Sequence, residues 1–337
     1  MSARAAIFGL SGLVLNETEA AFFREADPWG FILFARNVES PKQLAKLCVS
    51  LRDAVGREAP VFIDQEGGRV QRLRRPHWRD APPAALFGEL HAEDAEAAKE
   101  AVWLNHRLIA HELRSSGIDA DCAPCLDLAI EGADGVIGDR AYGSHAEVIA
   151  ALGQSAMDGL MAGGVAPVIK HVPGHGRADA DSHFHLPRVR EPLDCLTATD
   201  FAPFAALKHA PMGMTAHIVY EALDAEAPAT MSEVAIAHIR TEIGFDGLLM
   251  TDDLSMKALS GAFAERTTRS IAAGCDVVLH CNGDRKEMET IAWAAPLLYG
   301  SALRRAEAVE EARTQLEKFD VRSGLIRLET LLAGVMT

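Results

Sequence analysis

Three short segments of the chain concentrate side chains that enzymes use for nucleophilic and acid–base chemistry. They are Asp64-Gln-Glu-Gly-Gly-Arg69-Val-Gln-Arg72, the loop from Lys170-His171 to Asp181-Ser-His183, and Thr251-Asp252-Asp253. A carboxylate can attack carbon or hold a proton, and an imidazole beside a carboxylate can give and take back a proton at neutral pH. Each segment alone is a weak signal. Together they predict one catalytic site.

The middle segment is open to two interpretations. His183 and His185 are spaced i and i+2, a spacing that metal-binding histidines use, and this keeps a metal-dependent amide or ester hydrolase as an alternative. In the other interpretation, Asp181 contacts the imidazole of His183. A nearby carboxylate favours the imidazolium and raises its pKa, so that the ring can act first as acid and then as base.

The elements that must position these segments follow from the hydrophobic pattern. Short apolar runs alternate with helical patterns such as 41–55, 92–113, 147–161, 232–243 and 256–273. Apolar strands covered by crossover helices are typical of a parallel sheet. The eight runs are 5–10, 30–34, 60–64, 118–123, 165–170, 211–216, 247–252 and 275–280.

Eight strand–helix units predict an α/β fold of the (β/α)8 barrel type, with extra helices over 301–337. An open doubly wound sheet is the alternative, but the turn Gly9-Leu-Ser-Gly12 lacks the third glycine of a dinucleotide-binding loop. Polar residues follow most of the apolar runs. The carboxyl ends of barrel strands meet on one face, so we expect these residues to share one pocket there. We also expect Gly67 and Gly68 to let the backbone approach a ligand.

The three segments, together with Ile137-Gly-Asp-Arg140 and Ala216-His217, resemble glycoside hydrolase family 3 over about residues 30–282. Within it, the chain is similar to the single-domain β-N-acetylglucosaminidases of bacterial cell-wall recycling. The resemblance implies that Asp252 is the nucleophile and His183 the acid/base, with Asp181 as its partner. It also implies that five residues bind the sugar at the cleaved linkage: Asp64, Arg72, Arg140, Lys170 and His171.

The implied reaction is hydrolysis of terminal β-linked N-acetylglucosamine with retention, from anhydromuropeptide fragments and without metal or organic cofactor. The chain departs from the family pattern at Val172 and Cys125, and both changes keep an apolar side chain. Two further alternatives remain open besides the metal hydrolase. One is another family 3 glycosidase, acting on glucosides or xylosides, and the other is a sugar-binding protein without turnover.

Composition limits the partners. The 337 residues carry 33 basic and 48 acidic side chains, a net charge of −15, which argues against nucleic-acid or anionic membrane partners. Six cysteines, including the pair Cys122 and Cys125, are expected to be reduced core thiols. No signal-peptide cleavage site follows the first apolar run. We therefore expect a cytoplasmic monomer in which residues 1–337 form a single catalytic domain with a saccharide or glycopeptide substrate.

Overall fold

The computed structural model describes the chain except residues 1, 134, 183, 315, 336 and 337. Eight parallel strands close into a barrel in the order β1-β12-β11-β9-β7-β6-β3-β2. Their bounds are β1 (Arg4–Phe8), β2 (Pro28–Leu33), β3 (Val61–Ile63), β6 (Ala120–Asp121), β7 (Ala166–Val172), β9 (Met212–Thr215), β11 (Leu248–Asp253) and β12 (Val277–His280). Every one of the eight predicted runs overlaps one of these strands, so the predicted barrel is confirmed.

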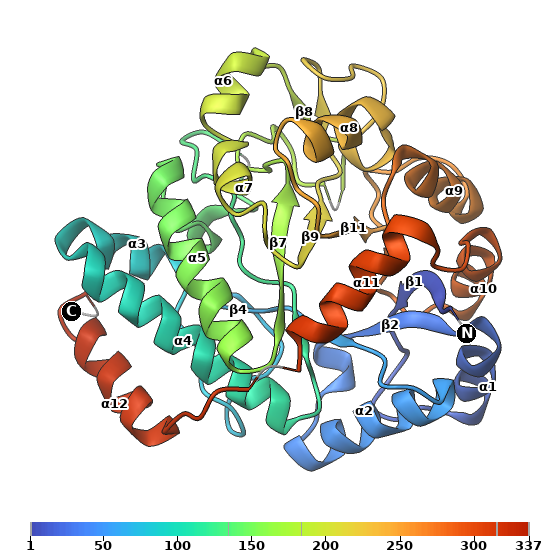
Figure 1. Cartoon of the computed structure of the whole chain (residues 1–337), viewed down its shortest axis with the longest axis horizontal. Coiled ribbons are helices and arrows are strands. Elements are labelled where there is room, and N and C mark those ends of the chain that lie inside the picture. The colour runs from blue at the N-terminus through green and yellow to red at the C-terminus, as the bar shows by residue number, and fades with distance from the viewer. Residues whose placement is uncertain (1, 134, 183, 315, 336–337) are drawn as a thin grey trace.

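Helices surround the barrel (Figure 1). They are α1 (Glu17–Ala26), α2 (Pro41–Val55), α3 (Ala84–Glu93), α4 (Ala95–Ser115), α5 (Ala146–Ala162), α6 (Leu193–Ala198), α7 (Ala202–Ala206), α8 (Glu233–Thr241), α9 (Phe263–Ala273), α10 (Arg285–Ala294), α11 (Gly300–Ala312) and α12 (Val321–Leu332). In Figure 1, α12 lies beside α4, and Arg327 donates two hydrogen bonds to Glu100 across this contact (2.8 and 2.6 Å).

Shorter elements lie in the loops. They are the antiparallel hairpin of β4 (Gln65–Gly67) and β5 (Val70–Gln71), the parallel pair of β8 (Arg188–Val189) and β10 (Val219–Tyr220), and the 3-10 turns η1 (Ala35–Asn37), η2 (Gly138–Arg140) and η3 (Ala229–Met231). The β4–β5 hairpin follows β3 and carries the first of the three chemical segments.

Local signals explain where several helices begin and end. The side chain of Asn16 accepts a hydrogen bond from the backbone N–H of Glu19, and the Glu19 side chain accepts one from Asn16, which forms a capping box ahead of α1. Two predicted helices begin later than expected. The 92–113 pattern is interrupted at Asp94, which caps α4 (Ala95–Ser115), and the pattern from 256 becomes helical only at Phe263.

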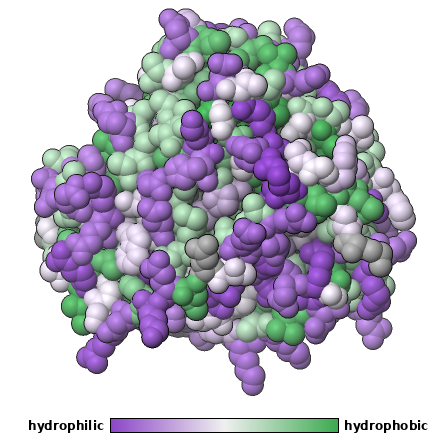
Figure 2. Space-filling view, in the orientation of Figure 1, coloured by the Kyte–Doolittle hydropathy of each residue, from purple (hydrophilic) through white to green (hydrophobic). Residues whose placement is uncertain are grey.

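The interior of the barrel is filled by apolar side chains that alternate with outward-facing ones along the strands. One buried cluster takes a residue from every barrel strand: Ile7, Ile32, Phe62, Ala120, Val168, Met212, Leu248 and Val277. This packed centre holds the strand ends at fixed positions. Hydrophilic side chains are spread over the face shown in Figure 2, with smaller hydrophobic areas between them. Among the described residues, no helix is long and apolar enough to cross a membrane.

Candidate active site

A cavity of about 340 Å³ lies at the carboxyl ends of the barrel strands. Six strand ends contribute to its lining: Phe34 after β2, Asp64 after β3, Lys170 in β7, Met214 in β9, Asp252 in β11 and Cys281 after β12. This is the face on which barrel enzymes build their active sites.

Seven of the eight predicted site residues line this one cavity. They are Asp64, Arg72, Arg140, Lys170, His171, Asp181 and Asp252. The eighth, His183, lies outside the described residues. Sequence positions almost 190 residues apart therefore meet at one site, as the strand pattern predicts.

Asp64 connects two cations at the floor of the cavity. Lys170 Nζ donates to Asp64 Oδ1 at 2.9 Å, and Arg72 Nη2 donates to Asp64 Oδ2 at 2.9 Å. Burial alone would raise the pKa of the Asp64 carboxyl, but the charges of Lys170 and Arg72 hold this pKa well below its ordinary value. The carboxylate is therefore ionised and fixed in orientation before any ligand arrives.

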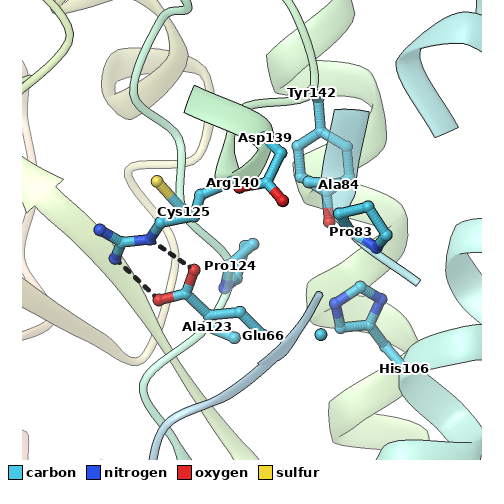
Figure 3. A pocket seen from close by; sticks show the side chains of 11 residues that line it. Glu66, Pro83, Ala84, His106, Ala123, Pro124, Cys125, Asp139, Arg140 and Tyr142 are labelled. Carbon is cyan, nitrogen blue, oxygen red and sulfur yellow. Dashed lines mark hydrogen bonds and ion pairs between the residues drawn. The ribbon is translucent and has the colours of Figure 1, made fainter. Parts of the chain in front are cut away.

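Glu66 belongs to this charged network, and the sequence analysis did not single it out. Its carboxylate accepts two hydrogen bonds of 2.8 Å from Arg140 (Figure 3). One of its carboxylate oxygens also lies 2.6 Å from Lys170 Nζ. Burial disfavours its charge, yet Arg140 and Lys170 lower the pKa of Glu66 to about 2. Glu66 thus fixes two predicted sugar-binding cations. Its place in the segment beginning at Asp64 was the available signal, but spacing alone does not show where its side chain points.

Asp121 lies beneath this cluster, at the end of β6. Its Oδ1 accepts the backbone N–H of Gln65 at 2.9 Å, which holds the peptide between Asp64 and Glu66. The side chain is fully buried, and burial, with the nearby charges of Asp64 and Glu66, raises the pKa of Asp121 to about 8. Asp121 is therefore mainly neutral at pH 7, while its two neighbours carry the negative charge.

The loop after β7 is held by a second buried carboxylate, Asp127. Asp127 Oδ2 contacts His171 Nδ1 at 2.7 Å, and Asp127 Oδ1 accepts the backbone N–H of His175 at 2.5 Å. Burial alone would raise the pKa of Asp127, but His171 and His175 hold this pKa well below its ordinary value. Because the carboxylate favours a proton on His171 Nδ1, the Nε2 atom of this ring remains available to a ligand in the cavity.

The segment that carries Asp181 is a turn. The Asp181 carbonyl accepts backbone N–H groups from Phe184 and His185, both at 3.0 Å. His175 Nε2 lies 3.1 Å from the hydroxyl of Ser182 and joins the turn to the buried part of the loop. Burial lowers the pKa of His175 to about 4, so this ring is neutral at pH 7. The turn places Asp181 at the cavity, next to the predicted acid/base position 183.

The adjacent carboxylates Asp252 and Asp253 occupy different surroundings. Asp253 accepts the N–H groups of Ser255 (2.9 Å) and Cys281 (3.1 Å) and the hydroxyl of Ser255 (2.5 Å). Asp252 accepts the backbone N–H of Asp253 at 2.7 Å, and both residues line the cavity, so the hydrogen bonds of Asp253 to the loop are what distinguish the two. Asp253 therefore holds the loop after β11 together, which supports the expectation that only its neighbour acts on substrate.

His217 supports this pair from the neighbouring strand. His217 Nε2 donates to the carbonyl of Asp253 at 3.1 Å, and its Nδ1 accepts from the hydroxyl of Thr230 at 2.7 Å. Burial lowers the pKa of His217, which favours the neutral ring that this pattern requires. The ring fixes the backbone that carries Asp252.

The two glycines of the first segment do not face the cavity as expected. Gly67 and Gly68 have φ values of +103° and +55°, and a Cβ on Gly67 would lie 2.3 Å from the carbonyl oxygen of Pro82. The reason for glycine here is the turn between β4 and β5 and its contact with the chain at Pro82, so the predicted approach to a ligand is not what requires it.

Within the described part of the chain, one group of three side chains has metal-ligand types close together: Cys125, Asp127 and His171, whose ligand atoms lie within 4.8 Å of one another. Asp127 already accepts hydrogen bonds from His171 and from Cys125 Sγ (3.2 Å). Burial raises the pKa of the Cys125 thiol well above its ordinary value, whereas a metal ligand must be a thiolate. The group fits a hydrogen-bonded anchor better than a metal centre.

Comparison with known proteins identifies the class. Residues 13–311 match the family model described as "Glycosyl hydrolase family 3 N terminal domain", and the chain belongs to this family. It is therefore a glycoside hydrolase. This agrees with a cavity in which carboxylates and fixed cations are arranged around a space of sugar size.

Two curated relatives are each named "Beta-hexosaminidase". The one from Thiobacillus denitrificans is 39% identical over 285 residues, covering 81% of this chain and 79% of that protein. The one from Thioalkalivibrio sulfidiphilus is 41% identical over 295 residues, covering 84% and 82%. Among solved structures, NagZ from Neisseria gonorrhoeae in complex with N-trifluoroacetyl-D-glucosamine superimposes with a TM-score of 0.86 at 30% identity, over 100% of this chain and 99% of that one.

Proposed function

We propose that Asp252 is the nucleophile of a retaining exo-β-N-acetylglucosaminidase and that Asp181 and His183 form its acid/base pair. The observation that supports this most strongly is the cavity at the strand ends, which Asp252 lines from β11 and Asp181 from the loop after β7. The β-hexosaminidase relatives and the similarity to a structure holding an N-acylated glucosamine support the same activity.

The reaction takes place in two steps. In the first, the Asp252 carboxylate forms a bond to the anomeric carbon as the bond to the leaving oxygen breaks, and His183 gives its proton to that oxygen. In the second, His183 takes a proton from water as the water displaces Asp252. Two inversions at one carbon give overall retention. Asp181 orients the imidazole and favours its charged form during the first step.

The charged floor of the cavity binds the sugar. Asp64, Lys170 and Arg72 are already joined by hydrogen bonds, as are Glu66 and Arg140, so their polar atoms need little reorganisation when sugar hydroxyl groups arrive. Hydrogen bonds from charged groups are about twice as strong as those from neutral ones.

The proposed substrates are anhydromuropeptide fragments that end in β-linked N-acetylglucosamine, processed in the cytoplasm during cell-wall recycling. Similarity to NagZ over the full length of both chains supports this role. We further propose that residues 1–337 act as one monomeric catalytic domain without nucleic-acid or membrane partners, in keeping with the net charge of −15.

The catalytic roles are tested by comparing Asp252→Ala with His183→Ala on an aryl N-acetylglucosaminide and on a natural disaccharide. Asp252→Ala should lose turnover of both. His183→Ala should still form the glycosyl-enzyme from the aryl substrate, which needs little protonation, and then stall. Azide should restore turnover and give the β-glycosyl azide, because azide attacks without losing a proton.

If His183→Ala loses turnover equally on the two substrates, with no azide rescue and no trapped intermediate, His183 does not carry the proton. The turnover of Asp181→Ala should fall between that of the wild type and that of His183→Ala. A panel of aryl N-acetylglucosaminide, glucoside and xyloside separates this activity from that of other family 3 glycosidases. No turnover of any of them would leave a sugar-binding protein.

Metal independence is a separate prediction. The described Cys125, Asp127 and His171 group is occupied by its own hydrogen bonds, and the proposed steps use only a carboxylate nucleophile and proton transfer by side chains. Activity should therefore be unchanged after treatment with EDTA and removal of the chelator. A loss that zinc or manganese restores would favour the metal-dependent hydrolase and would contradict the role given to His183.

A further inference from the structure

An exposed aromatic side chain and an exposed lysine meet on two loops whose neighbouring residues line the active-site cavity. Phe184 follows the acid/base position in the chain, and its side chain is 59% exposed. Lys257 lies on the loop after β11, and its Nζ lies 5.6 Å from the centre of the Phe184 ring. An ammonium group at this distance from an aromatic ring is within the range of a cation–π interaction.

The two loops that carry this pair are joined beside the catalytic groups. The backbone N–H of Ala258 donates to the carbonyl of Ser182 at 3.3 Å. Asp181, which precedes Ser182, and Met256, which precedes Lys257, both line the cavity. The Phe184–Lys257 pair does not itself line the cavity, but it lies within one to three residues along the chain of Asp181 and Met256, which do.

Lys257 contacts the Phe184 ring but has no carboxylate partner among the residues that the structure describes. Across the residues that the structure describes, no carboxylate oxygen lies within 4.0 Å of Lys257 Nζ, although most lysines and arginines around the cavity are paired in this way, such as Lys170 and Arg72 with Asp64. The chain as a whole is acidic, with a net charge of −15. A cation without an internal carboxylate beside a catalytic cavity can attract an anionic ligand.

We propose that Phe184 and Lys257 form the subsite for the leaving group and that this subsite selects leaving groups bearing a carboxylate. The inference rests on the proposed function, since the pair would contact what is attached to the sugar rather than the sugar itself. Phe184 offers an apolar face for a ring of the leaving group. Lys257 offers a charge-assisted hydrogen bond to its carboxylate. The carboxylate can belong to the ether-linked lactic acid of the muramyl unit or to an attached peptide.

Two aryl substrates test this directly: 4-nitrophenyl and 3-carboxy-4-nitrophenyl N-acetyl-β-D-glucosaminide. The measured quantity is the ratio of kcat/KM for the carboxylated substrate to kcat/KM for the neutral one. Comparing this ratio between variants cancels the intrinsic difference between the two leaving groups. Lys257→Met should lower the ratio about 3- to 10-fold, the range expected for one partly exposed charged contact, and Lys257→Glu should lower it further.

A matched control is Lys42→Met, because Lys42 is an exposed lysine on α2, far along the chain from the loops of the cavity. It should leave the ratio at its wild-type value. Raising the salt concentration from 50 to 500 mM should lower the wild-type ratio but not that of Lys257→Met, since screening acts only on the charged contact. Phe184→Ser should raise KM for both aryl substrates, and Phe184→Tyr should restore it.

A third comparison separates the two sources of the carboxylate. The disaccharide with a free lactyl carboxylate is compared with its lactyl amide and with the form that carries a peptide. If kcat/KM falls for the lactyl amide and recovers for the peptide form, Lys257 can contact either carboxylate. If kcat/KM for the peptide form is as low as for the amide, Lys257 contacts the lactyl carboxylate alone.

An unchanged ratio in both Lys257 variants would overturn the subsite while leaving the proposed function intact. Wild-type enzyme without activity on the neutral N-acetylglucosaminide would instead overturn the proposed function. The two failures are therefore distinguishable in the same set of assays.

Discussion

Lys170 is the residue on which the charged network converges. Its side chain is 3% exposed, and its ammonium lies 2.9 Å from Asp64 and 2.6 Å from Glu66. Nearby carboxylates counter its burial and raise the pKa of Lys170 above its ordinary value, so the group stays charged at any pH at which the enzyme is used. Removing one partner would leave a buried charge partly uncompensated, which costs about 3–5 kcal/mol in other proteins.

Asp64→Ala should therefore lower kcat/KM by at least about 100-fold, which corresponds to about 3 kcal/mol of lost transition-state stabilisation. It removes a proposed sugar contact and also loosens Lys170 and Arg72. Steady-state kinetics with an aryl N-acetylglucosaminide measure the effect. A useful control is Asp246→Ala, which breaks exposed ion pairs with Arg304 and Arg305 and should change kcat/KM less than about 3-fold. A loss of only a few-fold in Asp64→Ala would make Asp64 a structural residue.

For individual residues, the sequence predicted which side chains reach the site better than it predicted which side chains pair with one another. The side chains predicted at the site line the cavity wherever the structure describes them, because strand ends in a barrel must meet. Glu66 and Asp127 were not predicted as site residues, although Glu66 lies in the first chemical segment and Asp127 shortly follows the apolar run 118–123. Their roles depend on which way a buried carboxylate points, and a sequence without an alignment does not contain this information.

The packing of α5 against α4 depends on the absence of a side chain at Gly159. A Cβ added to Gly159 of α5 would lie 2.4 Å from the carbonyl oxygen of Trp103 in α4, a backbone atom that cannot move without the helix. The same Cβ would lie 3.1 Å from the Cβ of His106. The absence of a side chain at Gly159 thus sets the distance between the two helices.

Gly159→Ala should lower the free energy of unfolding by about 1–3 kcal/mol, the usual cost of overpacking, even though alanine favours helix more than glycine does. Urea denaturation measures the change. Gly12→Ala is the matched control, because a Cβ there would have no atom within 4 Å, and it should change stability by less than about 1 kcal/mol. Equal effects in both variants would contradict the packing argument.

Strands were easier to predict than helix starts. Each strand is a short apolar run between polar or glycine residues, and tertiary contacts alter only its ends. The helix expected from residue 256 begins at Phe263 instead, because Asp253 binds the backbone and hydroxyl of Ser255, and Gly261 has a φ of +89°. These contacts belong to the active-site loop, and hydrophobic periodicity gives no indication of them.

The stability of the whole protein depends on pH through its buried histidines. Burial lowers the pKa of His106 to about 4 from an ordinary value of 6.5, while its Nδ1 donates to the carbonyl of Val102 at 2.9 Å. Between these pH values the unfolded chain binds a proton that the folded chain excludes. Stability from this group is complete above pH 6.5 and is lost as the pH falls toward about 4. His175 acts in the same direction.

The free energy of unfolding of the wild type should therefore fall more between pH 7 and pH 4.5 than that of His106→Gln, by about 2–3 kcal/mol. Urea denaturation at a series of pH values measures the slope. His145→Gln, at an exposed position, should keep the wild-type slope. Parallel curves for wild type and His106→Gln would show that His106 is protonated equally in both states.

The closure of the barrel between β1 and β12 has a consequence for how the protein is made. Phe8 in β1 pairs with His280 in β12, so the partner of the first strand is among the last parts of the barrel to be synthesised. At about 5–20 residues per second, a ribosome needs roughly 15–55 s to reach β12 after finishing β1. During this time the nascent chain carries an unpaired edge on β1. Closure of the barrel must come late in synthesis, and until then the growing chain depends on chaperones or on its own helices to shield that edge.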